Sequence, residues 1–238
     1  MQKSLLNQGQ HEFKQPIYEF GSWLRVSLPL LLITGFIIIL YQTDLLMIGA
    51  FLGPTKVALY NAATKTSYLT TFIYTAAESI GAPMIASLYT KGNRVELQKL
   101  MTTMANLIFW PTMIITLFIV ALGNYILGVF GPEFVVARWS LAILLIGQLI
   151  NAGTGPVGYM LDLTGHQDKS VRVRFFTAFL NIFLCYILIP KFGIIGAAIA
   201  TATSVSLDNL IIYFLAVKYI GVHASIFSAF TLSKNNSR

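Results

Sequence analysis

Long unbroken runs of apolar residues, separated by short polar breaks, dominate this chain. Six runs approach the roughly 20 residues that an α-helix needs to cross a bilayer. Apolar residues are continuous within them and do not alternate, which favours helices, because a helix satisfies its own backbone hydrogen bonds in hydrocarbon. The pattern predicts an all-α polytopic membrane protein with about six transmembrane helices, at roughly Trp23–Leu52, Val57–Tyr89, Leu97–Leu122, Ala137–Leu161, Val171–Ile189 and Ile194–Tyr219.

The breaks between the runs contain residues that favour turns. They are Gly53-Pro54, Lys91-Gly92-Asn93, Gly131-Pro132, Gly165-His166 and Pro190-Lys191-Phe192-Gly193. The second run is the least hydrophobic of the six. We expect a cytoplasmic N-terminal segment at 1–21, a six-helix membrane domain at 22–220 and a cytoplasmic tail at 221–238.

Composition agrees with a membrane location. The 238 residues are 56% hydrophobic and 11% charged, whereas soluble domains average about 25% charged residues. Because these few charges cannot cover the surface of a globule of this size, we expect most of the surface to face lipid. The net charge of +7 does not indicate nucleic-acid binding, because the basic residues form small groups between apolar runs and no basic stripe.

Those basic groups predict the orientation, since Lys and Arg concentrate in cytoplasmic connections. With a cytoplasmic N-terminus, twelve basic residues fall on the inner side and three on the outer side. We therefore expect both termini in the cytoplasm and the chain in the inner (plasma) membrane. The inner residues are Lys3, Lys14, Arg25, Lys91, Arg94, Lys99, Lys169, Arg172, Arg174, Lys218, Lys234 and Arg238; the outer ones are Lys56, Arg138 and Lys191.

Ionisable residues inside the predicted spans are candidates for function, because burying a charge in lipid is costly. These residues are Asp44, Lys65, Glu78 and Asp208, with Asp162 near the end of a span. Asp44 and Lys65 lie about ten residues either side of the Gly53-Pro54 turn. An antiparallel hairpin would bring them to similar depth, so we expect an ion pair, either purely structural or with a gating or coupling role.

The second run carries a polar stripe. Eight polar residues fall within an arc of roughly 140° on a helix, which favours a water-filled cavity; a stripe buried against neighbouring helices by hydrogen bonds is the alternative. The eight are Asn61, Thr64, Lys65, Tyr68, Thr71, Thr75, Glu78 and Ser79.

Two other runs contain local features. In the fourth, Gln148 and Asn151 precede Pro156, which should kink the helix; a hinge or backbone site there competes with plain packing. In the sixth, small residues from Gly193 to Ser204 precede Asp208 and indicate a close-packing face.

Catalytic chemistry finds little support. The histidines His11, His166 and His223 have no ligand spacing to one another, and Cys185 is a single cysteine in an apolar run. No Gly-rich phosphate loop occurs, which argues against an ATP-driven mechanism within this chain. We expect no enzyme activity, no cofactor and no metal site.

Several motifs in order resemble the second half of bacterial polysaccharide flippases of the O-antigen type, members of the multidrug/oligosaccharidyl-lipid/polysaccharide exporter superfamily. The likeness covers roughly residues 22–220. It is carried by 27–30 (Ser-Leu-Pro-Leu), 44–49 (Asp-Leu-Leu-Met-Ile-Gly), 60–63 (Tyr-Asn-Ala-Ala), 130–134 (Phe-Gly-Pro-Glu-Phe), 147–152 (Gly-Gln-Leu-Ile-Asn-Ala), 161–167 and 188–198.

The resemblance implies one lobe of a two-lobe transporter that flips undecaprenyl-diphosphate-linked oligosaccharide for cell-surface polysaccharide synthesis, including lipopolysaccharide, by alternating access. A positive cavity lining is expected for such a substrate, and Lys65 and Arg25 fit it. The other expected cavity residues are Asn61, Tyr68, Thr75, Gln148 and Asn151, while Asp44, Glu78 and Asp208 are expected to serve ion coupling or gating.

The chain departs from these flippases because it matches the second lobe and not the first. A separate polypeptide could supply the first lobe, two copies could associate as a homodimer, or the chain could be the product of a split or truncated gene. Two alternatives remain open at this point: a cation-coupled multidrug extrusion transporter of the same fold, and a non-transporting remnant or interaction subunit.

Overall fold

The computed structural model describes residues 20–223, and these are helical throughout apart from short turns. The predicted all-α class is confirmed. The N-terminal segment and most of the tail fall outside the described residues, as does the side chain of Arg25. The helices are α1 (Phe20–Leu52), α2 (Pro54–Ser67), α3 (Thr71–Thr90), α4 (Arg94–Ala121), α5 (Gly123–Gly128), α6 (Arg138–Thr154), α7 (Val157–Leu163) and α8 (Gln167–Ile220), with 3₁₀ turns η1 (Tyr68–Thr70) and η2 (Pro132–Ala137).

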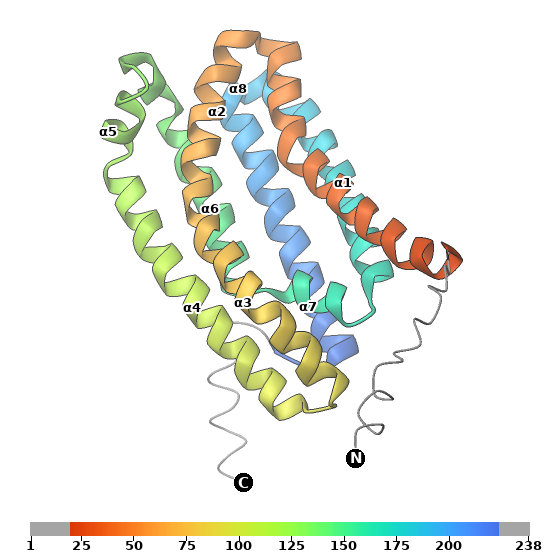
Figure 1. Cartoon of the computed structure of the whole chain (residues 1–238). Coiled ribbons are helices and arrows are strands. Elements are labelled where there is room, and N and C mark those ends of the chain that lie inside the picture. Colours follow the sequence, from red (N-terminus) through yellow and green to blue (C-terminus); the bar gives the residue numbers. More distant parts are fainter. Residues whose placement is uncertain (1–19, 224–238) are drawn as a thin grey trace, which may run out of the picture.

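The helices run up and down in a bundle (Figure 1). The α1 helix packs along α8, and α6 and α4 lie on the other side of the bundle core. The junctions of α1 with α2 and of α4 with α5 lie at one end, and those of α3 with α4 and of α7 with α8 at the other. This alternation agrees with the predicted order of passes.

Helix α8 contains the fifth and sixth predicted runs. Gly193 interrupts it with φ 60° and ψ −138°, a conformation that glycine adopts and other residues avoid. The chain therefore reverses there, and a first arm (167–192) and a second arm (194–220) result. A Cβ at Gly193 would lie 3.9 Å from the side chain of Leu52, which places this reversal beside the end of α1.

The second predicted run is not one continuous helix. Its α2 and α3 parts are joined by the tighter turn η1. Around this turn the hydroxyl groups of Ser67, Thr70 and Thr71 each donate to the carbonyl oxygen three residues earlier, at 2.7–2.8 Å. Such bonds draw the carbonyls away from regular α-helical pairing, so a run of hydroxyl residues favours a local 3₁₀ turn.

The fourth predicted run is also divided, and the expected kink at Pro156 is confirmed as a full break. Helix α6 ends at Thr154 and α7 begins at Val157, with Gly155 at φ 66° and ψ −170° between them. Proline lacks an amide N–H, so the α6 hydrogen bonds cannot continue through it.

Among residues 20–223, four segments are long and apolar enough to cross a membrane: Ser27–Leu52, Arg94–Ala121, Pro132–Thr154 and Gln167–Ile220. The last contains two passes because it reverses at Gly193. The more polar α2–α3 unit runs beside these segments in Figure 1. Large apolar side chains such as Leu46 and Phe72, 74% and 76% exposed, face outward, as lipid contact requires.

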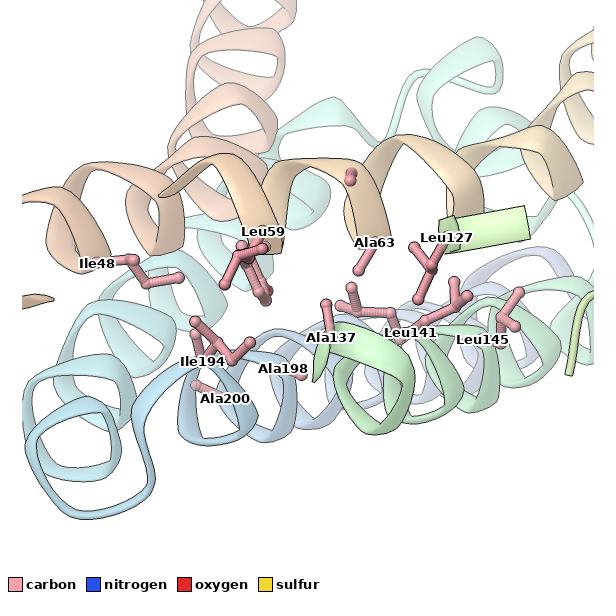
Figure 2. Close-up of a cluster of buried hydrophobic side chains, with 14 of the residues drawn as sticks. Ile48, Leu59, Ala63, Leu127, Ala137, Leu141, Leu145, Ile194, Ala198 and Ala200 are labelled. Carbon is pink, nitrogen blue, oxygen red and sulfur yellow. The ribbon is translucent and has the colours of Figure 1, made fainter. Parts of the chain in front are cut away.

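Two apolar clusters form the core. One, shown in Figure 2, gathers α1, α2, α6 and both arms of α8 around Tyr60 and Leu145. The other joins α3, α4, α7 and the second arm around Met101 and Met160. The predicted close-packing face is confirmed: Ala197, Ala200 and Ser204 are fully buried.

Candidate functional site

A cavity of about 650 Å³ opens within the bundle. Helices α1, α3, α6, α7 and both arms of α8 contribute to its wall, so residues far apart in the sequence meet there. The polar and charged residues of the wall are Thr34, Tyr41, Tyr74, Glu78, Asn151, Tyr159, Asp162, Gln167, Arg174, Asp208 and Asn209. The cavity therefore has a mixed wall, in which polar and charged groups lie among apolar ones inside the membrane bundle.

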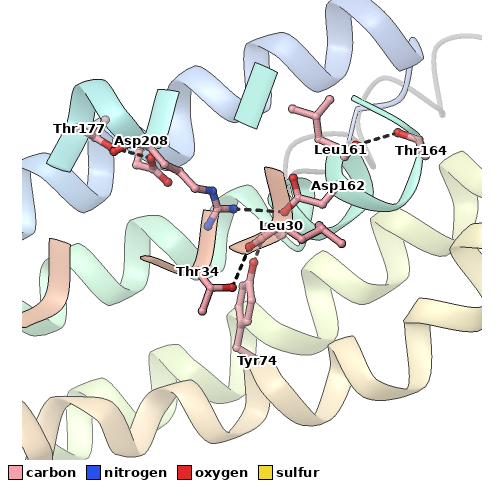
Figure 3. A network of polar contacts seen from close by, with 10 residues as sticks. Leu30, Thr34, Tyr74, Leu161, Asp162, Thr164, Thr177 and Asp208 are labelled. Carbon is pink, nitrogen blue, oxygen red and sulfur yellow. Dashed lines mark hydrogen bonds and ion pairs between the residues drawn. The ribbon is translucent and has the colours of Figure 1, made fainter. Parts of the chain in front are cut away.

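An ion pair crosses one side of this cavity (Figure 3). Nη2 of Arg174, on the first arm of α8, lies 3.6 Å from Oδ2 of Asp162 on α7, and the two side chains are 11% and 14% exposed. A Cβ at Gly158 would come within 2.8 Å of the same guanidinium. Because glycine has no Cβ, α7 leaves room for the arginine to reach Asp162 and the cavity.

A second carboxylate, Asp208, is contributed by the second arm of α8. Thr177 Oγ1 donates a 2.8 Å hydrogen bond to Asp208 Oδ1, and Asp208 is 8% exposed. Asp208 also lies within electrostatic reach of Arg174. The two arms of α8 are thus joined by polar contacts at the level of the cavity.

Helix α3 brings a third carboxylate, Glu78, which interacts electrostatically with both Arg174 and Asp162. One turn earlier on α3, the Tyr74 hydroxyl donates to the carbonyl oxygen of Gly155 at 3.4 Å. This contact ties α3 to the break between α6 and α7. Within residues 20–223, no group of three or more His, Cys, Asp or Glu is placed to hold a metal ion.

A separate polar node surrounds Asp44, which is fully buried. Its Oδ2 accepts hydrogen bonds from the Tyr60 hydroxyl at 2.7 Å and from Thr201 Oγ1 at 3.0 Å, and its Oδ1 accepts from the Leu45 amide at 2.8 Å. Thr201 in turn accepts from the Asn181 amide at 3.4 Å. The node joins α1, α2 and both arms of α8.

The predicted ion pair between Asp44 and Lys65 is wrong, because Tyr60 occupies the position facing Asp44. Lys65 is exposed, and its Nζ lies 5.9 Å from the ring centre of Tyr68. Equal distance from the Gly53-Pro54 turn predicts equal depth, but not which face of α2 turns toward α1. Tyr60 and Lys65 are five residues apart and so point roughly 140° away from each other.

The cavity brings together three of the predicted site residues: Glu78, Asn151 and Asp208. Tyr68 and Gln148 line a much smaller space of about 10 Å³, with Tyr41. The predicted residues with described side chains that line neither space are Asp44, Asn61, Lys65 and Thr75. The polar stripe does not line one continuous space, because Tyr68 lines the smaller space and Glu78 the larger one.

The sequence pattern does not predict Arg174, Tyr74 or Thr177 as site residues. Arg174 is one of the inner basic residues from which the orientation is predicted. That role gives no indication that its side chain lies inside the bundle. Its spacing carries a signal, since Arg174, Thr177 and Asn181 recur at i, i+3 and i+7 in an apolar run. Such spacing places polar side chains on one face of a helix.

Comparisons with known proteins bear on this site. A family model described as MatE matches residues 29–187. The chain is 29% identical over 173 residues to the probable low-salt glycan biosynthesis flippase Agl15 and 26% identical over 174 residues to the probable flippase AglR, both of Haloferax volcanii. It is also 25% identical over 198 residues to the uncharacterized membrane protein MJ1068 of Methanocaldococcus jannaschii.

These matches cover 71–78% of this chain but 36% of each relative, so the chain spans about a third of the length of the relatives it matches. No solved structure matches it. The flippases named are archaeal. The comparisons support the wider superfamily, while the bacterial polysaccharide branch remains a prediction.

Proposed function

This chain belongs to the MatE family, and we propose that it forms one lobe of a membrane transporter that moves a lipid-linked oligosaccharide from the inner to the outer leaflet. Two of its relatives are named as flippases, one of them for glycan biosynthesis. The proposal concerns binding and conformational change, with no bond made or broken in the substrate.

The observation that carries this proposal is a cavity of about 650 Å³ within a membrane bundle, with an arginine and other polar groups in its wall. A lipid-linked oligosaccharide carries phosphate where its sugar joins the lipid, and arginine is the residue best suited to hold phosphate. A basic group was expected from Lys65 and Arg25; Arg174 supplies one inside the cavity. An undecaprenyl diphosphate carrier is the substrate class that we propose.

A second lobe completes the transporter in this proposal. The chain spans about a third of its relatives, so a second six-helix lobe or a second copy of this chain would close the other side of the pathway. The residues proposed to contact substrate in the complete assembly are Asn61, Lys65, Tyr68 and Thr75 on the α2–α3 unit, with Arg25, Gln148 and Asn151. Asp44, Glu78 and Asp208 are proposed to serve ion coupling or gating.

The test compares a strain that lacks this chain with the same strain in which the chain is expressed again as part of the complete transporter. Loss of the chain should cause lipid-linked glycan to accumulate in the inner leaflet, and re-expression should restore surface glycan. Accumulation would be measured by mass spectrometry of extracted lipids. Unchanged lipid-linked glycan in the deletion strain would contradict the proposal and favour a non-transporting remnant or interaction subunit.

A cation-coupled multidrug extrusion transporter is the second candidate. It is favoured by Glu78, Asp162 and Asp208 in the cavity wall, because carboxylates attract organic cations and coupling ions. Drug-dependent proton or sodium flux in proteoliposomes, with unchanged lipid-linked glycan in the deletion strain, would support this candidate over the first.

A further inference from the structure

The cavity contains an imbalance of charge around one guanidinium. Arg174 is the one basic residue among the described residues that line it, whereas Glu78, Asp162 and Asp208 supply three carboxyl groups. These come from α3, α7 and the second arm of α8, and each lies within electrostatic reach of Arg174. With all four groups ionised, the described wall has a formal charge of −2.

The helices that face Arg174 bring tyrosine and acidic side chains toward it. The titratable groups that interact with it are Tyr41 on α1, Tyr74 and Glu78 on α3, Asp162 on α7 and Asp208 on the second arm of α8. None of these groups carries a positive charge. An anionic group entering the cavity therefore meets repulsion from carboxylates as well as attraction to the guanidinium.

The pairing of Arg174 with Asp162 leaves bonding capacity unused. At 3.6 Å the contact is too long for a strong hydrogen bond, and Arg174 Nε and Asp162 Oδ1 are buried without a hydrogen-bond partner among the described residues. A buried donor without an acceptor costs free energy. A ligand that brings acceptor oxygens to the guanidinium would remove that cost, and phosphate suits its planar fork of donors.

We propose that Arg174 is the anion-binding residue of this cavity, and that it accepts a phosphate group only as protons neutralise the neighbouring carboxylates. This inference rests on the proposed function, because it assumes a phosphate-bearing substrate. Asp162 and Asp208 act as internal competitors for the guanidinium. When they are ionised they hold Arg174 and repel phosphate; when they are protonated Arg174 is released to the ligand.

The inference makes anion binding proton-linked. The full chain in lipid nanodiscs would be titrated with geranylgeranyl diphosphate, a lipid diphosphate probe, by calorimetry in two buffers of different ionisation enthalpy. Binding should be tighter at mildly acidic than at neutral pH, because protonation removes negative charge from the wall. The buffer dependence of the heat should show uptake of about one proton or more per ligand bound.

Matched variants identify the groups responsible. Arg174→Gln should weaken binding about tenfold or more, since hydrogen bonds to charged groups contribute at this scale, and Arg174→Lys should retain part of the affinity. Arg172→Gln is the control, because Arg172 lies two residues earlier and its side chain is 76% exposed. Asp162→Asn should strengthen binding at neutral pH several-fold and reduce both the pH dependence and the proton uptake.

Each outcome decides between the proposals. If Arg174→Gln binds the probe as well as Arg172→Gln does, or if wild type binds it without proton uptake, the inference is overturned and the proposed flippase function is untouched. If wild type does not bind the probe at either pH, the inference falls together with the diphosphate substrate. Proton-linked binding in a chain whose deletion leaves lipid-linked glycan unchanged would support the inference and contradict the flippase function.

Discussion

At the scale of single residues, buried polar groups distinguish two places with different chemistry. The Asp44 node is closed: Asp44 and Tyr60 are fully buried and hydrogen-bonded to each other. Arg174 and Asp162 instead line an open cavity and have unused bonding capacity. We interpret the first place as an internal connection between helices, through which Asp44 would take part in gating, and the second as the place where a ligand acts.

Removing the Asp44 carboxylate should destabilise the bundle. In Asp44→Ala, the hydroxyls of Tyr60 and Thr201 lose their buried acceptor, and such a loss costs about 1–3 kcal/mol of unfolding free energy. We expect a decrease of about 2 kcal/mol, measured by reversible denaturation in detergent micelles. Thr34→Ala on the same helix is the control, since Thr34 Oγ1 bonds an exposed carbonyl; equal stability of the two variants would contradict the node's structural role.

At the scale of elements, hydrophobic runs and turn residues predict more of the molecule than polar patterns do. The runs and breaks predict the ends of α1 and α4 closely, because apolar length and Gly-Pro turns are local properties. The path of the chain from α2 to α3 depends on hydroxyl hydrogen bonds around η1. The partner of Asp44 is Tyr60, which lies on the face of α2 that packs against α1. Those outcomes arise from packing between helices, so an ideal helical projection misses them.

The candidate site shows the same limit. Glu78 and Asp208 are recognisable in the sequence because carboxylates stand out in apolar runs. Arg174 is not, because basic residues near the ends of spans usually indicate topology. Its place in the cavity depends on Gly158, which leaves space on a helix from another part of the chain.

The reversal of α8 depends on one glycine. Gly193→Ala should destabilise the chain by about 1–3 kcal/mol, because the φ of 60° and ψ of −138° strain any residue that has a Cβ. Gly35→Ala is the matched control: it lies in α1, a Cβ there has no neighbour within 4 Å, and alanine is the better helix former. Denaturation of both variants tests this, and equal stabilities would show that the reversal tolerates a side chain.

At the scale of the whole molecule, a membrane bundle encloses a cavity with polar and charged groups in its wall, to which five helices contribute. The apolar exterior and the alternating passes place the bundle in lipid, while the cavity wall combines Arg174 with three carboxyl groups. The family and its flippase relatives give this arrangement a transport context. The proposed transport function requires that this cavity be open to water or substrate inside the membrane.

Single-cysteine labelling tests this most directly. Cys185 is the one cysteine of the chain, so Cys185→Ala gives a background without cysteine. In this background, Asn151→Cys in the cavity wall is compared with Asn181→Cys, which lies in the fully buried Asp44 node. With a membrane-impermeant thiol reagent applied to inside-out and right-side-out vesicles, we expect Asn151→Cys to react readily from at least one side and Asn181→Cys to stay unmodified. Equal protection of both cysteines from both sides would contradict the presence of an accessible cavity.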